Sequence, residues 1–104
     1  MANWEVKKDN FGWIQLFTVY NADGTLKNLT GYTVTLKVWS ESTLKFSTAC
    51  ILDVNPLTGK CTHTVAASNF DTVGPYFGEL ELTKPGEKLD VKTFTILVKE
   101  TAPN

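Results

Sequence analysis

Hydrophobic and polar residues alternate along most of this 104-residue chain. In one segment, for example, Val34, Leu36 and Val38 are each separated by a single polar residue. A period of two is typical of a β-strand with one buried and one solvated face, whereas an amphipathic helix repeats every ~3.6 residues. Because no window of about eleven residues follows the helical period, the sequence predicts an all-β fold.

Turn-forming residues divide this pattern into about seven strands. Glycine, proline, asparagine and aspartate cluster between the alternating runs, and the segment 67–71 is too short for a stable helix. Short strands with a turn every ~8 to 12 residues predict a sandwich or a barrel. We expect strands at residues 4–7, 12–20, 32–40, 44–52, 60–66, 76–83 and 91–100.

The chain length fits one domain spanning residues 1–104. A chain of this size buries roughly 60–70% of the surface that its unfolded form exposes, which is enough for one hydrophobic core. Its contents of 42% hydrophobic and 20% charged residues are close to the globular average. We therefore expect a domain that folds alone, with a core from about residue 3 to 99 and a frayed tail at 101–104.

The charge balance disfavours two classes of partner. Ten basic and eleven acidic residues give a net charge of −1, which creates no field that would attract nucleic acid or anionic lipid. The sequence has no apolar run of the ~18 residues that span a membrane, and its first residues do not resemble a signal peptide. We expect no nucleic acid and no membrane among the partners, and synthesis in a cytoplasm.

Groups that could catalyse a reaction or bind a metal are sparse. His63 and Cys61 share a strand face, but residues two apart on a strand lie about 7 Å from each other and need not touch. Glu79 and Glu81 share the solvated face of their strand, and the turn at Asp23 lacks the final acidic ligand of a calcium loop. The sequence predicts no catalytic residue, no cofactor and no metal site.

Cys50 and Cys61 flank the turn at 53–59. If the hairpin is centred between Asn55 and Pro56, the two cysteines are directly opposed, with Cα atoms about 4.5 or 5.5 Å apart. This pairing allows a cross-strand disulfide that would stabilise the fold by up to about 3 kcal/mol, whereas a cytoplasm favours two thiols. From the sequence both alternatives stay open.

Aromatic side chains supply the candidate partner surface. Trp39 and Phe77 are out of phase with the buried residues of their strands and should face outward. Trp13 is a third candidate. Aromatic residues mark interfaces, although a ring that closes the core is an equally good interpretation.

Three segments of the chain together resemble the N-terminal domain of phage baseplate upper proteins. Residues 17–36 combine a strand, an Asp-Gly turn, Leu-Thr-Gly and a second strand. Residues 50–65 resemble the family's central hairpin, and residues 74–82, Gly-Pro-Tyr-Phe-Gly-Glu-Leu-Glu-Leu, resemble its later alternating strand. The resemblance covers roughly residues 3 to 99 and departs from the family pattern at residues 9–12.

The resemblance implies an immunoglobulin-like antiparallel β-sandwich in a non-enzymatic structural protein of a tailed-phage virion. It further implies synthesis in the host cytoplasm, a place in the baseplate, tail or head, and assembly into a homo-oligomer or with other virion proteins. A terminal strand without a neighbour could also accept a strand from a partner. The alternative is a carbohydrate-binding or adhesion module whose exposed aromatic rings stack on sugars.

Overall fold

The computed structural model describes residues 3–41 and 43–100, and these contain eight strands and one 3₁₀ turn. No helix in these two ranges has the length and apolar character needed to cross a membrane. The all-β prediction is confirmed, whereas the predicted tail at 101–104 lies outside the described residues. The elements are β1 (Asn3–Lys7), β2 (Ile14–Thr18), β3 (Thr33–Ser40), β4 (Thr43–Ala49), β5 (Ile51–Leu52), η1 (Pro56–Thr58), β6 (Lys60–Thr64), β7 (Gly74–Lys84) and β8 (Glu87–Lys99).

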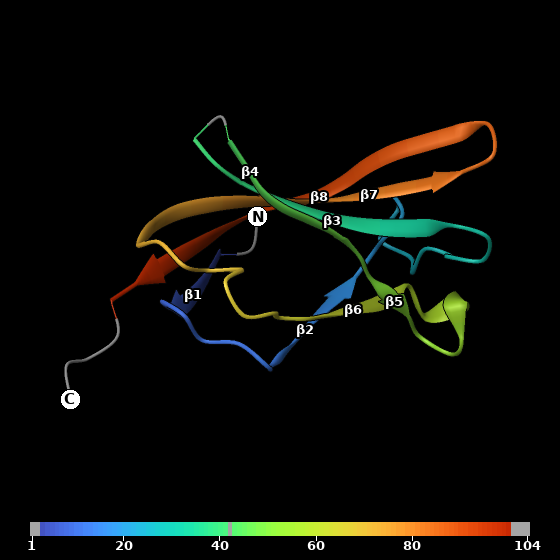
Figure 1. Ribbon diagram of the computed structural model, residues 1–104. Helices are drawn as coiled ribbons and strands as arrows, with labels where there is room; N and C mark the ends of the chain where they lie inside the picture. The colour runs from blue at the N-terminus through green and yellow to red at the C-terminus, as the bar shows by residue number, and fades with distance from the viewer. Residues whose placement is uncertain (1–2, 42, 101–104) are drawn as a thin grey trace.

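The strands form two sheets that pack face to face (Figure 1). One sheet has five strands in the order β1-β8-β7-β3-β4, and the other has three in the order β2-β6-β5. Strand β1 runs parallel to β8, and the remaining neighbours are antiparallel. The predicted β-sandwich is therefore confirmed.

The predicted strand at 44–52 is in fact two strands that belong to different sheets. Strand β4 ends at Ala49 in the five-stranded sheet, and β5 begins at Ile51 in the three-stranded sheet. Between them, the Cys50 N–H still donates to the Val34 carbonyl of β3 at 2.8 Å. The sequence does not reveal this crossing, because the side-chain period is two in both sheets.

Two further boundaries follow from turn geometry. The predicted strand at 12–20 is shortened to β2, because Gly12 has a φ of 91° and turns the chain before Ile14. At the other end of the molecule, Lys84 pairs with Glu87 across a tight turn. Strand β8 therefore begins four residues before the predicted strand at 91–100, and β7 and β8 form one long hairpin.

The core between the sheets is built around three aromatic rings. Trp4 on β1 and Phe94 on β8 come from the five-stranded sheet, with ring centroids 4.8 Å apart. Phe17 on β2 comes from the opposite sheet, and its centroid lies 5.3 Å from Trp4 and 5.4 Å from Phe94. Tilted rings at these distances attract each other beyond their apolar burial, so this cluster joins the two layers.

Gly78 on β7 provides the space for the Phe94 ring. The two residues are directly opposed in the β7–β8 ladder. A Cβ atom at position 78 would lie 2.2 Å from Cε2 of Phe94, which is far inside van der Waals contact. Glycine is therefore required here because of the ring above it.

We expect Gly78→Ala to lower the free energy of unfolding by about 1–3 kcal/mol, because the added methyl group displaces Phe94 from its aromatic neighbours. Urea denaturation measures the difference. The control is the same substitution in a Phe94→Leu background, where the clashing ring atoms are gone and the loss should be smaller. Equal losses in both backgrounds would contradict this contact.

Candidate docking surfaces

The outer face of the five-stranded sheet carries a network of opposite charges. Lys37 bonds to Glu81, and Lys88 lies 3.6 Å from Glu81 and 3.1 Å from Asp90. The Lys37 ammonium lowers the pKa of Glu81, whereas partial burial and then the nearby Asp90 carboxylate raise the pKa of Glu79. These groups neutralise one another on an open face, an arrangement suited to water.

One end of the same face is apolar. Trp39 on β3 and Phe77 on β7 are directly opposed, with ring centroids 6.1 Å apart. Leu44 on β4 is opposite Trp39 and is 59% exposed. The structure therefore places Trp39 and Phe77 on the outer face and adds Leu44 to them. Sequence analysis missed Leu44 because cross-strand neighbours depend on the register.

Trp13 lies elsewhere in the fold. It precedes β2 at the open side of the sandwich, and its ring stacks on Phe70 with centroids 6.5 Å apart. Trp13 therefore does not lie beside Trp39 and Phe77, and a role for it in binding a partner stays a prediction. Trp13 packs against the core between the sheets, whereas the other two rings point away from it.

The outer face of the three-stranded sheet exposes aliphatic side chains. Ile14, Leu16 and Ile51 are 64%, 56% and 71% exposed. Leu16 and Ile51 lie on either side of Thr62, because both pair with it in the sheet. Lys60 is the one charged residue on the outward side of β2, β5 and β6, which the structure describes in full.

Sequence analysis missed this face for a specific reason. The segment around β2 carries apolar residues in both phases, Ile14 and Leu16 in one and Phe17 and Val19 in the other. A run that is apolar in both phases does not say which side is buried. In the folded domain Phe17 and Val19 are buried, which leaves Ile14 and Leu16 in solvent.

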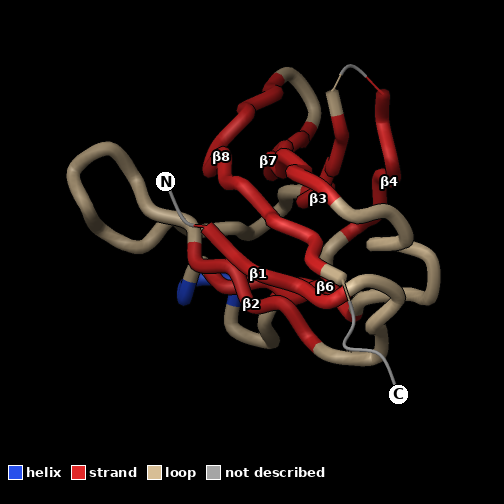
Figure 2. The backbone as a smooth tube through the Cα atoms, turned by 90° about the vertical axis from the view of Figure 1, so that its left-hand side faces the viewer, coloured by secondary structure: helices blue, strands red, loops and turns tan. Residues whose placement is uncertain are grey.

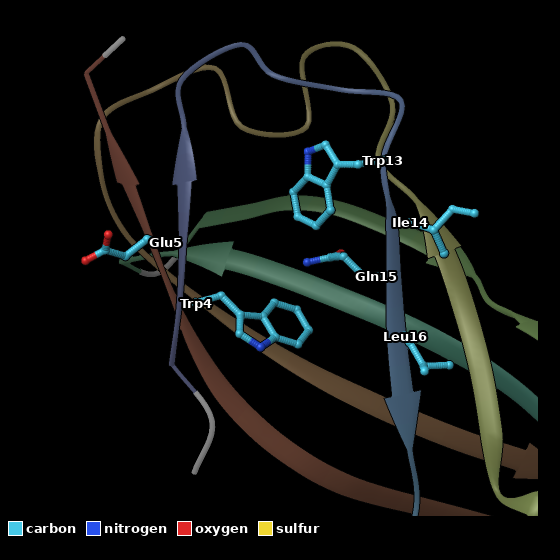
Figure 3. Close-up of a pocket in the computed structure, with 6 residues that line it drawn as sticks. All are labelled: Trp4, Glu5, Trp13, Ile14, Gln15 and Leu16. Atoms are coloured by element: carbon cyan, nitrogen blue, oxygen red, sulfur yellow. The ribbon is translucent and has the colours of Figure 1, made fainter. Parts of the chain in front are cut away.

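A cleft of about 450 Å³ lies between β1 and β2. The tubes of the two strands lie next to each other in Figure 2, and Figure 3 shows the Trp4 and Trp13 rings on either side of the Gln15 side chain, between the strands. Ile14 and Leu16 lie along the outer rim of the cleft. The cleft is therefore mainly aromatic, with one amide inside.

Gln15 is a polar residue at a core position. Its side chain is 3% exposed, and neither Nε2 nor Oε1 has a hydrogen-bond partner among the described residues. An amide buried without a partner costs about 1–3 kcal/mol. Buried polar groups in folded proteins nearly always have partners, so Gln15 is an exception among the described residues.

The cysteines come together, but in a different register from the predicted one. Cys61 on β6 is opposite Leu52 on β5, so the hairpin is centred one residue later than predicted, between Pro56 and Leu57. The turn covers residues 53–59 as predicted, and within it the Asn55 side chain caps η1 by accepting from the Leu57 N–H, which favours the observed register.

Both cysteines are thiols in the structure. The hydrogen bond with Cys61 and, next, burial raise the pKa of the Cys50 thiol. A raised pKa makes the Cys50 thiol a poor nucleophile, so this residue is suited to packing. A disulfide between them stays a prediction of the sequence. Thiol titration of the unfolded protein without reductant checks it, since a bridged protein yields no thiol and a reduced one yields two.

His63 lies on the inner side of β6. Its Nε2 is 3.2 Å from Oδ1 of Asn69, and its ring stacks on Phe46 with centroids 5.7 Å apart. Burial lowers the pKa of His63, and the hydrogen bond with Asn69 opposes part of that shift. Within residues 3–41 and 43–100, no three His, Cys, Asp or Glu side chains come close enough to bind one metal ion.

A two-layer sandwich that exposes sheet faces and strand edges defines an immunoglobulin-like structural domain. The crystal structure of CopC from Methylosinus trichosporium OB3b is similar to it, with a TM-score of 0.59 over 100% of this chain and 90% of that chain. At 9% sequence identity this likeness shows the fold alone.

The family follows from the sequence model of the BppU N-terminal domain, which matches residues 3–102. The chain belongs to this family of phage baseplate upper protein domains, which confirms the resemblance seen in the sequence. It is therefore a structural domain of a phage baseplate and a component of the virion. No curated protein matches the chain.

We expect the stability of the domain to fall as the pH drops below about 6.5, because the unfolded chain then binds a proton at His63 that the folded state, with its lowered pKa, does not bind. The stabilisation that His63 contributes is fully present above about pH 6.5. Urea denaturation at several pH values between about 5.5 and 7.5 measures the slope, which is at most about 1.4 kcal/mol per pH unit. His63→Gln should flatten it, and an unchanged slope in that variant would contradict the assignment.

Proposed function

We propose that this domain builds the baseplate by docking the outer face of its three-stranded sheet against a neighbouring virion protein, without catalysis. The exposed aliphatic row of Ile14, Leu16 and Ile51 carries this proposal. Apolar side chains on one flat face bury well against a partner, and the centres of protein interfaces are depleted in charge. The neighbour is another baseplate protein or a second copy of this chain, and the experiment separates the two.

The contrast between the two outer faces supports this choice. On the five-stranded sheet, lysines and carboxylates pair across β3, β7 and β8, so a partner would have to remove water from several charges. The three-stranded sheet offers threonines and aliphatic side chains, which lose little on contact. Removing water from the outer face of the three-stranded sheet therefore costs less free energy, which favours this face as the main interface.

The aromatic end of the five-stranded sheet is a second proposed contact. Trp39 and Phe77 are half-buried against each other, and Leu44 extends the apolar surface beside them. Tryptophan is enriched among the residues that contribute most to binding. This patch lies on the opposite face of the sandwich from Ile51, so a domain that uses both contacts bridges two neighbours.

We expect the double variant Leu16→Lys/Ile51→Lys to bind its baseplate neighbours at least about tenfold more weakly, because two charges must then be desolvated at the interface. Size-exclusion chromatography with light scattering measures this binding. It is applied first to the domain alone and then to its mixtures with each of the other baseplate proteins of the same phage. Assembly of the domain alone identifies the second copy as the neighbour.

The matched control places two lysines on the other outer face, as Ser47→Lys/Thr93→Lys. Both residues are exposed, and each is opposite an outward residue of β3 or β7. The control should assemble like the unchanged domain. Full binding by Leu16→Lys/Ile51→Lys, or an equal loss in the control, would contradict the proposed face.

A further inference from the structure

Strands β1 and β2 are edge strands of different sheets, and they lie along the same side of the sandwich. Strand β1 ends the order of the five-stranded sheet, and β2 ends that of the three-stranded sheet. In Figure 3 the two strands flank the cleft and run in opposite directions. Within the described residues no strand pairs with the second edge of either, so each edge presents backbone donors and acceptors.

The cleft between these edges contains an amide that has no partner. Gln15 is 3% exposed and extends from β2 into the cleft, where both its Nε2 and its Oε1 are unpaired within the described part of the chain. The Gln15 amide therefore needs an acceptor for its Nε2 and a donor for its Oε1 at the same place. A residue of an extended chain presents its N–H and its C=O on the same side of the strand.

The shape of the site is elongated. Two further hollows, of about 440 and 330 Å³, border β1. The larger one is lined by Thr95 and Leu97 on the outer side of β8, whereas the smaller one follows β1 to Lys7. All three hollows share Glu5, and the cleft shares Trp13 with the smaller one. The cleft and the smaller hollow together follow β1 from Trp4 to Lys7, and this elongated shape suits an extended segment better than a compact ligand.

We propose that the cleft between β1 and β2 binds an extended polypeptide segment of another baseplate protein, which pairs with the open edge of β2 and hydrogen-bonds to the Gln15 amide. The choice of a baseplate protein rests on the proposed function. Addition of a strand to a sheet edge gives affinity through main-chain hydrogen bonds and specificity through side-chain pockets.

The lining of the cleft defines the side chains that the segment carries. The rings of Trp4 and Trp13 form the walls, and Trp4 also packs on the core rings of Phe17 and Phe94. The Glu5 carboxylate at the rim lies 3.0 Å from Nζ of Lys99, so its charge is already paired. The bound segment therefore presents uncharged, apolar side chains to the cleft.

Synthetic peptides of about ten residues, tiled across the other baseplate proteins of the same phage, test this inference against the whole domain. Isothermal titration calorimetry measures affinity, and backbone amide NMR signals locate the site. We expect a peptide that shifts the signals of β1 and β2. Gln15→Met should bind it at least about tenfold more weakly while unfolding at a higher temperature, because methionine needs no hydrogen bond. The control Thr93→Met, on the opposite face, should bind it unchanged.

Two analogues of the bound peptide separate main-chain pairing from side-chain recognition. Each is N-methylated at alternate residues, so that one loses the N–H groups that face β2 and the other loses those that face away. Only the first should fail to bind. Equal binding by both analogues, full affinity in Gln15→Met, or no bound peptide would overturn the inference.

The same binding and assembly measurements distinguish the peptide site from its alternatives. A glycan that shifts the Trp4 and Trp13 signals, with no peptide bound, would overturn the peptide site in favour of a sugar site. If no peptide binds but Leu16→Lys/Ile51→Lys still loses assembly, the cleft proposal fails and the proposed function stands. If peptides bind the cleft and that double variant assembles normally, the sheet-face proposal fails instead.

Discussion

The packing of Phe94 on Gly78 is the contact on which the rest of the structure depends. The missing side chain at position 78 lets the ring lie against β7, and from there the ring reaches Trp4 and Phe17. Because Phe17 comes from the opposite sheet, this one cluster sets how the two layers face each other. It also fixes β1 and β2, which flank the cleft, since Trp4 and Phe17 are part of those strands.

The outer faces of the two sheets differ in polarity. The larger sheet pairs lysines with carboxylates over most of its outer face, so that face is stable in solvent. The smaller sheet exposes aliphatic side chains, and the side between β1 and β2 exposes strand edges. The two proposed contacts therefore lie on different sides of the domain.

Gln15 connects the fold to this assembly role. A hydrophobic residue at its position would stabilise the isolated domain, since a buried amide without a partner is unfavourable. A partner that supplies a donor and an acceptor recovers that free energy, and it does so only when it reaches the inner side of β2. In the proposed complex the same residue weakens the free domain and favours the bound one, which would make it a source of specificity in assembly.

The class of fold, the strand content and the family could all be predicted from the order of the amino acids. Period-two alternation identifies strands wherever one face is buried, and it correctly placed Trp39 and Phe77 outside. The spacing of turns and of short motifs along the chain carried the resemblance to baseplate domains, which the family match confirms.

Which sheet each strand joins and which faces stay open depend on long-range contacts that the sequence pattern does not show. Alternation is the same in both sheets, so it could not show that the chain crosses over at Cys50, or that Trp13 packs inward. It also could not set the hairpin register, which depends on the Asn55 cap of η1. The cleft around Gln15 is formed by strands from different sheets, and such a site exists only once long-range packing has placed them side by side.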